Sequence, residues 1–280
     1  MTTTEALQET APHQGKEGLG EFIIHHIKDS HEWNLFGYHI HLPTFEPINV
    51  LGVQIDLSIT LHVVMMWIAS LILILTFWLL FRKKRLVPRG FAAILESMVL
   101  FVRDEIAVPN MGIKNGKKFT PLLATMFFFI LTCNLMGLIP LFVTATGNIS
   151  VTASLAIITF FVTQIMGMVE NGAFGYFKSM VPSGIPFPLI FIMVPIEIFG
   201  LFTKPFALAM RLFANMIAGH TVVFALLGLI IALGTVLVAP FGVGFAVFID
   251  LLEILVAFIQ AYIFTMLSSL FISMAMHPEH

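Results

Sequence analysis

The C-terminal third of the chain carries ionisable side chains inside stretches that are otherwise apolar. Glu197, Lys204 and Arg211 are spaced by seven residues, so an α-helix places them along nearly one stripe, with Asn215 one turn beyond Arg211. A charged group at the centre of a bilayer costs at least about 2.5–3.5 kcal/mol. Because arginine keeps its proton in proteins, Arg211 is a candidate for a functional cation rather than a neutral packing group.

A second polar stripe lies further along, where Glu253 and Gln260 are again seven residues apart. If the two segments form an antiparallel hairpin, one register brings Arg211 near Gln260 and His220 near Glu253. Buried polar groups are tolerated when they are paired in this way, and imidazole and carboxylate groups can relay protons. An ideal helix turns His220 about 180° from Arg211, so a kink or a helix crossing is needed if both serve one site.

Simpler roles remain open for several other polar residues. Lys204 can extend its ammonium group to the cytoplasmic surface, and Asp250 can lie near an aqueous end of its helix. Asn134 can be a hydrogen-bonded amide between packed helices. The histidines of the N-terminal segment match no defined ligand spacing, so we expect no metal and no cofactor.

The composition places the chain among membrane proteins. Of its 280 residues 58% are hydrophobic and 11% are charged, whereas soluble domains are about one quarter charged. No Asp, Glu, Lys or Arg occurs in 119–169 or in 212–249. The formal net charge of −2 argues against a nucleic-acid-binding protein, and a single cysteine excludes an internal disulfide.

We therefore expect an all-α membrane protein with five transmembrane crossings and an amphipathic helix on the cytoplasmic surface. The last two helices are expected to be long, antiparallel and steeply tilted, because each exceeds the roughly 20 residues that a perpendicular span needs. The turn-rich stretch 109–118 is expected to be a loop. The expected spans are about 59–81, 119–143, 151–168, 188–231 and 243–274, and the surface helix is about 91–106.

The charge distribution predicts the orientation of the chain. Residues 1–57 form an acidic polar segment with eight carboxylates against two lysines, and 58–280 form the membrane domain. The segment 82–118 carries nine Lys or Arg residues against three acids, which favours the cytoplasmic side. The N-terminal segment is then outside the cytoplasm, and five crossings place the C-terminus inside.

Several sequence motifs are similar to those of one known family. The stretch "RLFANMIAG" is preceded by "PIEIFGLFTKP" and followed by "FIQAYIFTMLSSLFISMA". "FTPLLATMFFFILTCNLMGLIP" and "GNISVTASLAIITF" also look like the family's third and fourth helices. With these motifs the chain resembles subunit a of the F-type ATP synthases, closely over 119–280 and more loosely over the basic segment. The acidic N-terminal segment lies outside the resemblance.

The resemblance implies a role for each polar residue of the two stripes. Arg211 corresponds to the family's essential arginine, Asn215 to its neighbouring asparagine and Gln260 to the glutamine of its last helix. The other residues of the implied proton pathway are Glu197, Lys204, His220, Glu253 and Asn134.

The chain also departs from the common family pattern. Many members have glycine where this chain has Ala214. Many also carry a glutamate in place of His220 and a histidine in place of Glu253. Because this exchange is reciprocal, the acid–imidazole pair is kept with its sides swapped.

The resemblance further implies a stator in the bacterial plasma (inner) membrane that lies against a rotating ring of proteolipid c subunits. Its other implied partners are the peripheral-stalk b subunits, the remainder of the ATP synthase and the lipid bilayer. Two proton half-channels would lead to and from Arg211, which discharges each carboxylate of the ring. The chain would not be an enzyme by itself, since it has no phosphate-binding glycine loop of its own.

Three other function classes are weighed against this interpretation. A stand-alone proton- or sodium-coupled secondary transporter should show repeat symmetry, which the sequence lacks. An intramembrane metalloprotease needs a motif such as H-E-x-x-H, and "HEWNL" at His31 lacks the second histidine. A purely structural membrane anchor leaves the buried arginine unexplained.

Overall fold

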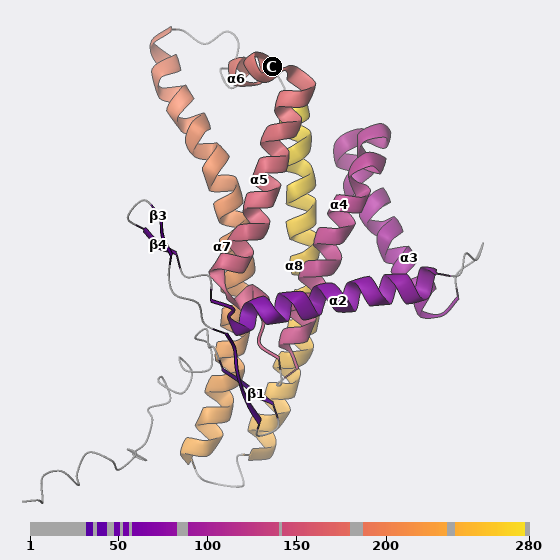
Figure 1. Cartoon of the computed structure of the whole chain (residues 1–280), viewed down its shortest axis with the longest axis vertical. Helices are drawn as coiled ribbons and strands as arrows, with labels where there is room; N and C mark the ends of the chain where they lie inside the picture. The colour runs from indigo at the N-terminus through magenta and orange to yellow at the C-terminus, as the bar shows by residue number, and fades with distance from the viewer. Residues whose placement is uncertain are drawn as a thin grey trace, which may run out of the picture.

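The computed structural model shows a helical bundle with two small β-hairpins on its N-terminal side (Figure 1). It describes residues 32–35, 38–43, 48–50, 53–55, 58–82, 89–139, 142–179, 187–233 and 239–277. In this part of the chain five helices are long and apolar enough to cross a membrane. The prediction of an all-α membrane protein is thereby confirmed.

The helices follow one another with short connections. They are α2 (Leu61–Phe81), α3 (Phe91–Phe101), the π-helix η1 (Val102–Ala107), α4 (Val108–Gly137), the 3-10 turn η2 (Ala145–Gly147), α5 (Ile149–Asn171), α6 (Ala173–Ser179), α7 (Phe187–Leu233) and α8 (Ala239–Met276). The strands β1 (Glu32–Leu35) and β2 (Tyr38–His41) pair antiparallel, as do β3 (Ile48–Val50) and β4 (Val53–Ile55). These hairpins have no counterpart in the sequence prediction.

The expected loop at 109–118 is wrong, because this stretch is helical on both sides of a single break. Gly112 has a φ of +75°, a conformation that glycine adopts without strain, and the chain reverses there. The two arms approach so closely that a Cβ on Gly116 would lie 2.7 Å from the Cα of Val108. Glycine at 112 and 116 therefore converts a predicted loop into a tight helical hairpin.

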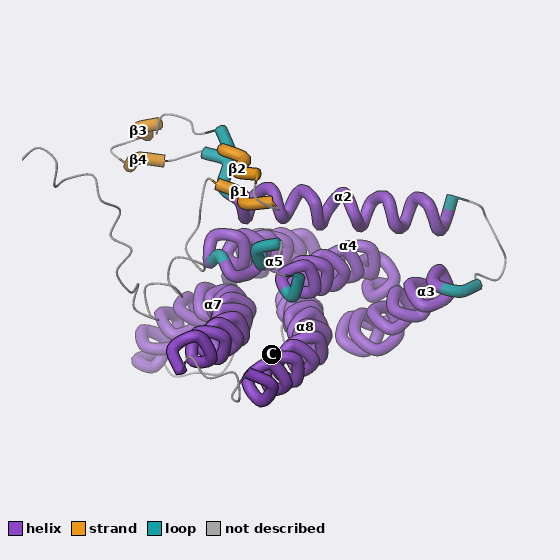
Figure 2. The backbone as a smooth tube through the Cα atoms, turned by 90° about the horizontal axis from the view of Figure 1, so that it is seen from below, coloured by secondary structure: helices purple, strands orange, loops and turns teal. Residues whose placement is uncertain are grey.

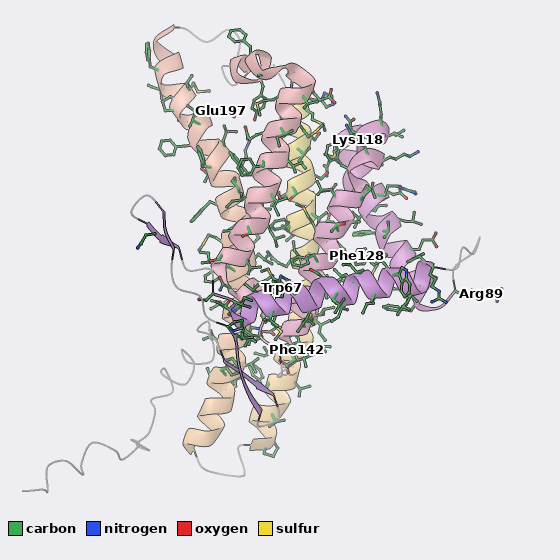
Figure 3. All side chains as sticks on the ribbon, in the orientation of Figure 1. Trp67, Arg89, Lys118, Phe128, Phe142 and Glu197 are labelled. Atoms are coloured by element: carbon green, nitrogen blue, oxygen red, sulfur yellow. The ribbon has the colours of Figure 1, made fainter. Side chains whose placement is uncertain are left out.

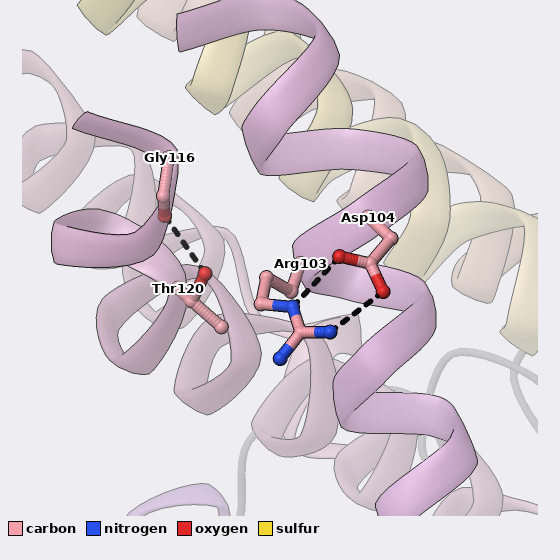
Figure 4. A network of polar contacts seen from close by, with 4 residues as sticks. All are labelled: Arg103, Asp104, Gly116 and Thr120. Atoms are coloured by element: carbon pink, nitrogen blue, oxygen red, sulfur yellow. Dashed lines mark hydrogen bonds and ion pairs between the residues drawn. The ribbon is translucent and has the colours of Figure 1, made fainter. Parts of the chain in front are cut away.

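The segment η1 packs inward as well as facing outward. Ile106 is wholly buried, and its carbonyl accepts hydrogen bonds from Asn110 Nδ2 at 2.9 Å and from Ser269 Oγ of α8 at 3.4 Å. On the exposed side, the Arg103 guanidinium donates two hydrogen bonds of 2.7 and 2.8 Å to the Asp104 carboxylate (Figure 4). The range predicted for a surface helix is thus anchored to the last helix of the bundle.

The core lies between α4, α5, α7 and α8. Apolar residues from α4, α7 and α8 form one buried cluster, in which Leu123, Ile130, Leu212 and Phe264 are almost completely enclosed. The Oγ atoms of Thr159 on α5 and Ser268 on α8 lie 3.3 Å apart within it. Helix α4 ends at Gly137, earlier than the predicted boundary at 143, in keeping with the proline at position 140 that disfavours helix before it.

Helix α2 runs in a different direction from the rest of the bundle. Figures 1 and 2 show it crossing α4, α5, α7 and α8 at a large angle, while α7 and α8 run antiparallel to each other. Helix α7 has 47 residues, about 70 Å at 1.5 Å per residue, which is more than twice the thickness of a hydrocarbon layer. A helix of that length must either tilt steeply or extend beyond the lipid.

Candidate functional site

Arg211 lies on the outer side of α7. Its side chain is exposed, while the adjacent Leu212 is wholly buried, so the helix turns the guanidinium away from the core. Among the described residues Arg211 forms neither a hydrogen bond nor an ion pair. Arg211 therefore carries a permanent positive charge that no acidic side chain of the described residues pairs with.

The amides predicted to accompany Arg211 lie further inward. Gln260 on α8 is only 5% exposed and sits between the wholly enclosed Ala257 and Ala261. Asn215 is half-buried, and its Nδ2 atom is buried without a hydrogen-bond partner in the described chain. Within the described residues neither amide hydrogen-bonds to Arg211.

A first cavity, of about 640 Å³, lies between α5, α6, α7 and α8. We call it the Glu197 cavity, and its polar lining includes Gln164, Tyr176, Glu197, Lys204 and His277. Figure 3 shows Glu197 on the half of α7 that lies toward α6. The Lys204 ammonium lies 5.7 Å from the centre of the Phe271 ring and forms no ion pair with Glu197.

Helix α6 covers one side of the Glu197 cavity with Tyr176. The phenol donates a 2.9 Å hydrogen bond to Gln164 Oε1, and its ring fills the space left by the missing Cβ of Gly167. Burial raises the pKa of Tyr176 above its usual range, and the nearby charge of Glu197 acts in the same direction. Tyr176 is therefore a neutral hydrogen-bond donor at the edge of a cavity that contains an acid.

A second cavity, of about 420 Å³, lies between the first turn of α2, the segment around η2, and helices α7 and α8. We call it the His220 cavity, and its polar lining is His62, Thr144, His220, Asp250 and Glu253. Phe142, which also lines it, is labelled in Figure 3 close to the crossing with α2, well away from Glu197. The two cavities thus lie at different levels of the bundle.

The predicted pair of His220 and Glu253 shares this cavity but does not make direct contact. His220 Nε2 hydrogen-bonds to the Thr144 hydroxyl instead. The Glu253 carboxylate lies in the space that Gly219 leaves for lack of a side chain, and its Oε1 atom is buried without a partner in the described chain. Within the described residues His220 Nε2 is therefore bonded to Thr144, and the pairing of His220 with Glu253 stays a prediction.

Arg211 lies between the two cavities. Along α7, Pro205 lines the Glu197 cavity and Ile217 lines the His220 cavity, each six residues, or about 9 Å of helix rise, from Arg211. Arg211, Asn215 and Gln260 line neither cavity. The arginine thus separates two polar spaces on the same pair of helices.

Asn134 is placed apart from both cavities. It is wholly buried on α4, and its Oδ1 atom accepts a 2.6 Å hydrogen bond from the Thr146 hydroxyl. Its Nδ2 atom has no hydrogen-bond partner in the described chain. The position fits the packing interpretation of this residue at least as well as a place in a proton pathway.

The structure adds to the His220 cavity three polar residues that the sequence analysis did not assign to a site. Asp250 could have been found from the sequence, since it lies three residues before Glu253 and so on the same side of α8. His62 carried a weaker signal, as the only readily titratable side chain in an apolar helix. Thr144 carried no signal, because an isolated hydroxyl between helices is common and its contact with His220 spans 76 positions.

Comparison with known proteins decides the family. The family model described as ATP synthase A chain matches residues 63–273, three quarters of the chain. The chain belongs to this family. It is 52% identical over 266 residues to an ATP synthase subunit a of Chloroherpeton thalassium, with 92% of this chain and 77% of the relative covered.

Other members of the ATP synthase A chain family are similarly close. An ATP synthase subunit a of Myxococcus xanthus is 54% identical over 229 residues, covering 81% of this chain and 75% of the relative. One of Anaeromyxobacter dehalogenans is 49% identical over 285 residues, covering 94% and 73%. The range matched by the family model contains every predicted site residue from Asn134 to Gln260.

Proposed function

We propose that this member of the ATP synthase A chain family is the stator of the membrane motor and that it carries two proton half-channels separated by Arg211. The observation that carries this proposal is an exposed arginine, unpaired among the described residues, between two separate polar cavities on α7 and α8. The proposed partner of that arginine is a ring of proteolipid c subunits, each with one lipid-buried carboxylate.

The charge of Arg211 gives the ring acid a place to lose its proton. A carboxylic acid in lipid stays neutral because desolvation disfavours the charged form, whereas a cation within about 4–6 Å favours it. Arg211 would therefore discharge each acid that arrives. Its fixed positive charge would also stop a proton from passing directly between the cavities.

The two cavities supply the polar surroundings that such half-channels need. The buried atoms Asn215 Nδ2 and Glu253 Oε1 have no partner in the described chain, and buried polar groups of this kind are normally satisfied by water. His220, Asp250 and Glu253 would pass protons from outside, and Glu197 with Tyr176 would line the exit to the cytoplasm. Each charge that crosses about 100 mV releases about 2.3 kcal/mol.

The surface around Arg211 suits a partner within the membrane. Phe199 and Phe206 on α7 are 74% and 64% exposed, and Leu251 on α8 is 64% exposed. The ring of c subunits would cover part of this apolar surface, and lipid and the peripheral-stalk b subunits would cover the rest. We place the N-terminal segment outside and the C-terminus in the cytoplasm of a bacterial inner membrane, since basic residues follow α2 directly.

Substitution of Arg211 tests the proposal. Arg211→Ala should abolish ATP-driven proton pumping in inside-out membrane vesicles, and Arg211→Lys should largely do so, because lysine carries a compact point charge. Arg103→Ala is a matched control, since Arg103 pairs with its neighbour Asp104 on the outer side of η1. Normal pumping by Arg211→Ala, with the complex assembled to the wild-type level, would falsify the proposed role.

A further inference from the structure

We infer that His62 of α2 is a proton carrier of the His220 cavity, and that it passes protons from the outer solution toward His220 and Glu253. The inference rests on the proposed function, because it assigns a third helix to the outer half-channel. The observation behind it is that the first turn of α2 contributes an imidazole to a cavity otherwise shaped by α7, α8 and the segment around η2.

The burial of His62 is unusual for its helix. Its side chain is 3% exposed, while the other inward residues of the same stretch, Leu61, Met65 and Ala69, are apolar and belong to a small hydrophobic cluster. Moving an imidazole out of water into such surroundings is unfavourable unless polar groups are near. The His220 cavity provides these groups, and an apolar residue would serve α2 equally well if only packing mattered.

The location of His62 along α2 fits an outer position in the pathway. Helix α2 begins at Leu61, and the basic residues 82–85 follow its other end. In the proposed orientation His62 therefore lies at the outer end of the span, where protons arrive. On α8, Glu253 lies closer than Asp250 to Gln260 and so to the level of Arg211, which places it deeper in the pathway.

The cavity can connect these groups without direct contact between their side chains. Its volume of about 420 Å³ has room for on the order of ten water molecules at about 30 Å³ each. The titratable groups that line it are His62 from α2, His220 from α7, and Asp250 and Glu253 from α8. His62 would take a proton from outer water and release one to cavity water, so the imidazole returns to its neutral form after each transfer.

The role can be tested by measuring the rate of ATP synthesis in inside-out vesicles at several lumenal pH values. The lumen of such vesicles corresponds to the outer side of the membrane. A proton carrier at the entrance matters most where protons are scarce, because hydronium seldom reaches the deeper groups directly at high pH. We expect His62→Gln to synthesise ATP about tenfold more slowly than wild type at a lumenal pH of about 8. This is less than the roughly 100- to 10,000-fold that a positioned proton-transfer group contributes, because cavity water can replace His62 in part. At about pH 6 the loss should be less than about twofold, since hydronium then supplies the deeper groups directly.

His62→Ala provides a second measurement, because it leaves room for a small base. Imidazole added to the lumen should restore synthesis by His62→Ala and should have no effect on Arg211→Ala. Ser70→Ala is the matched control on α2, since among the described residues Ser70 bonds only to the Met66 carbonyl of its own helix, and it lies outside the cavity. Its rate should equal the wild-type rate at every pH.

Two results would overturn the inference, provided that the assembled complex is present at the wild-type level. One is a wild-type pH profile for His62→Gln. The other is an equal loss at all pH values without rescue by imidazole, which would mark His62 as a packing residue. Either result leaves the proposed function intact if Arg211→Ala is inactive, whereas normal synthesis by Arg211→Ala would defeat the proposed function itself.

Discussion

Gly219 offers a way to move the Glu253 carboxylate without touching its chemistry. A Cβ added to Gly219 would lie 2.7 Å from the carboxyl carbon of Glu253, whereas ordinary van der Waals contact begins near 3.4 Å. The carboxyl carbon must therefore move by about 0.7 Å, and Glu253 Oε1, which the added Cβ would overlap, must move further. The group that must move is the free end of a flexible side chain. Gly219→Ala should therefore displace the carboxylate while leaving the helices in place.

The expected effect is large on proton flow and small on stability. A misplacement of about 1 Å can cost a reacting group about 100-fold in rate, so we expect Gly219→Ala to pump protons ten- to 100-fold more slowly than wild type. The amount of assembled complex in the membrane should stay the same, because the strain is relieved by one side chain. ATP-driven acidification of inside-out vesicles, normalised to the ATPase activity, measures the rate.

Two further variants make the test specific. Gly200→Ala lies on the same helix, where an added Cβ meets no atom within 4 Å, and it should pump at the wild-type rate. Combining Gly219→Ala with Glu253→Asp shortens the acid by one methylene and should recover part of the lost rate. If Gly219→Ala pumps as fast as Gly200→Ala, the carboxylate position has no bearing on proton flow and the reasoning is wrong.

Two other predictions concern the cavities. The double exchange His220→Glu with Glu253→His should retain more pumping than either single exchange, because one acid and one imidazole then still line the cavity; additive losses would show that the two sites are independent. Tyr176→Phe removes the hydrogen bond to Gln164 and should lower stability by about 0.5–1.5 kcal/mol. Thermal denaturation of the purified complex measures the second effect, and an unchanged melting temperature would mean that water replaces the phenol.

The sequence was most informative where apolar runs are long and free of charge. Helix α7 spans Phe187–Leu233 and α8 spans Ala239–Met276, close to the predicted 188–231 and 243–274, because few other elements can be built from such runs. The observed helix α7 also contains both Glu197 and Arg211, as predicted. These features depend on local periodicity, which a sequence shows directly.

Features that depend on contacts between distant segments could not be predicted in this way. The hydroxyl of Thr144 reaches His220 across 76 positions, and no local pattern marks it as a partner. From the sequence, the stretch around Gly112 is indistinguishable from an ordinary turn-rich loop. Only the structure shows the close approach of Gly116 to Val108. For the same reason His62, a lone polar residue in an apolar helix, could not be assigned to a cavity formed by three other segments.

Two of the three buried side-chain atoms that lack a hydrogen-bond partner among the described residues lie on α7 and α8, and the third is Asn134 Nδ2 on α4. The helices α4, α5 and α8 satisfy their buried hydroxyls within the bundle, as Thr159, Ser268 and Thr265 do. On the α7–α8 side, Asn215 Nδ2 and Glu253 Oε1 have no partner among the described residues. Sequences selected for stability alone would pair such atoms, since each costs about 1–3 kcal/mol when buried and unsatisfied. Asn215 follows Arg211 toward His220 along α7, and Glu253 lines the His220 cavity, so both atoms lie on the same side of Arg211. In the proposed function, water of the outer half-channel would satisfy them.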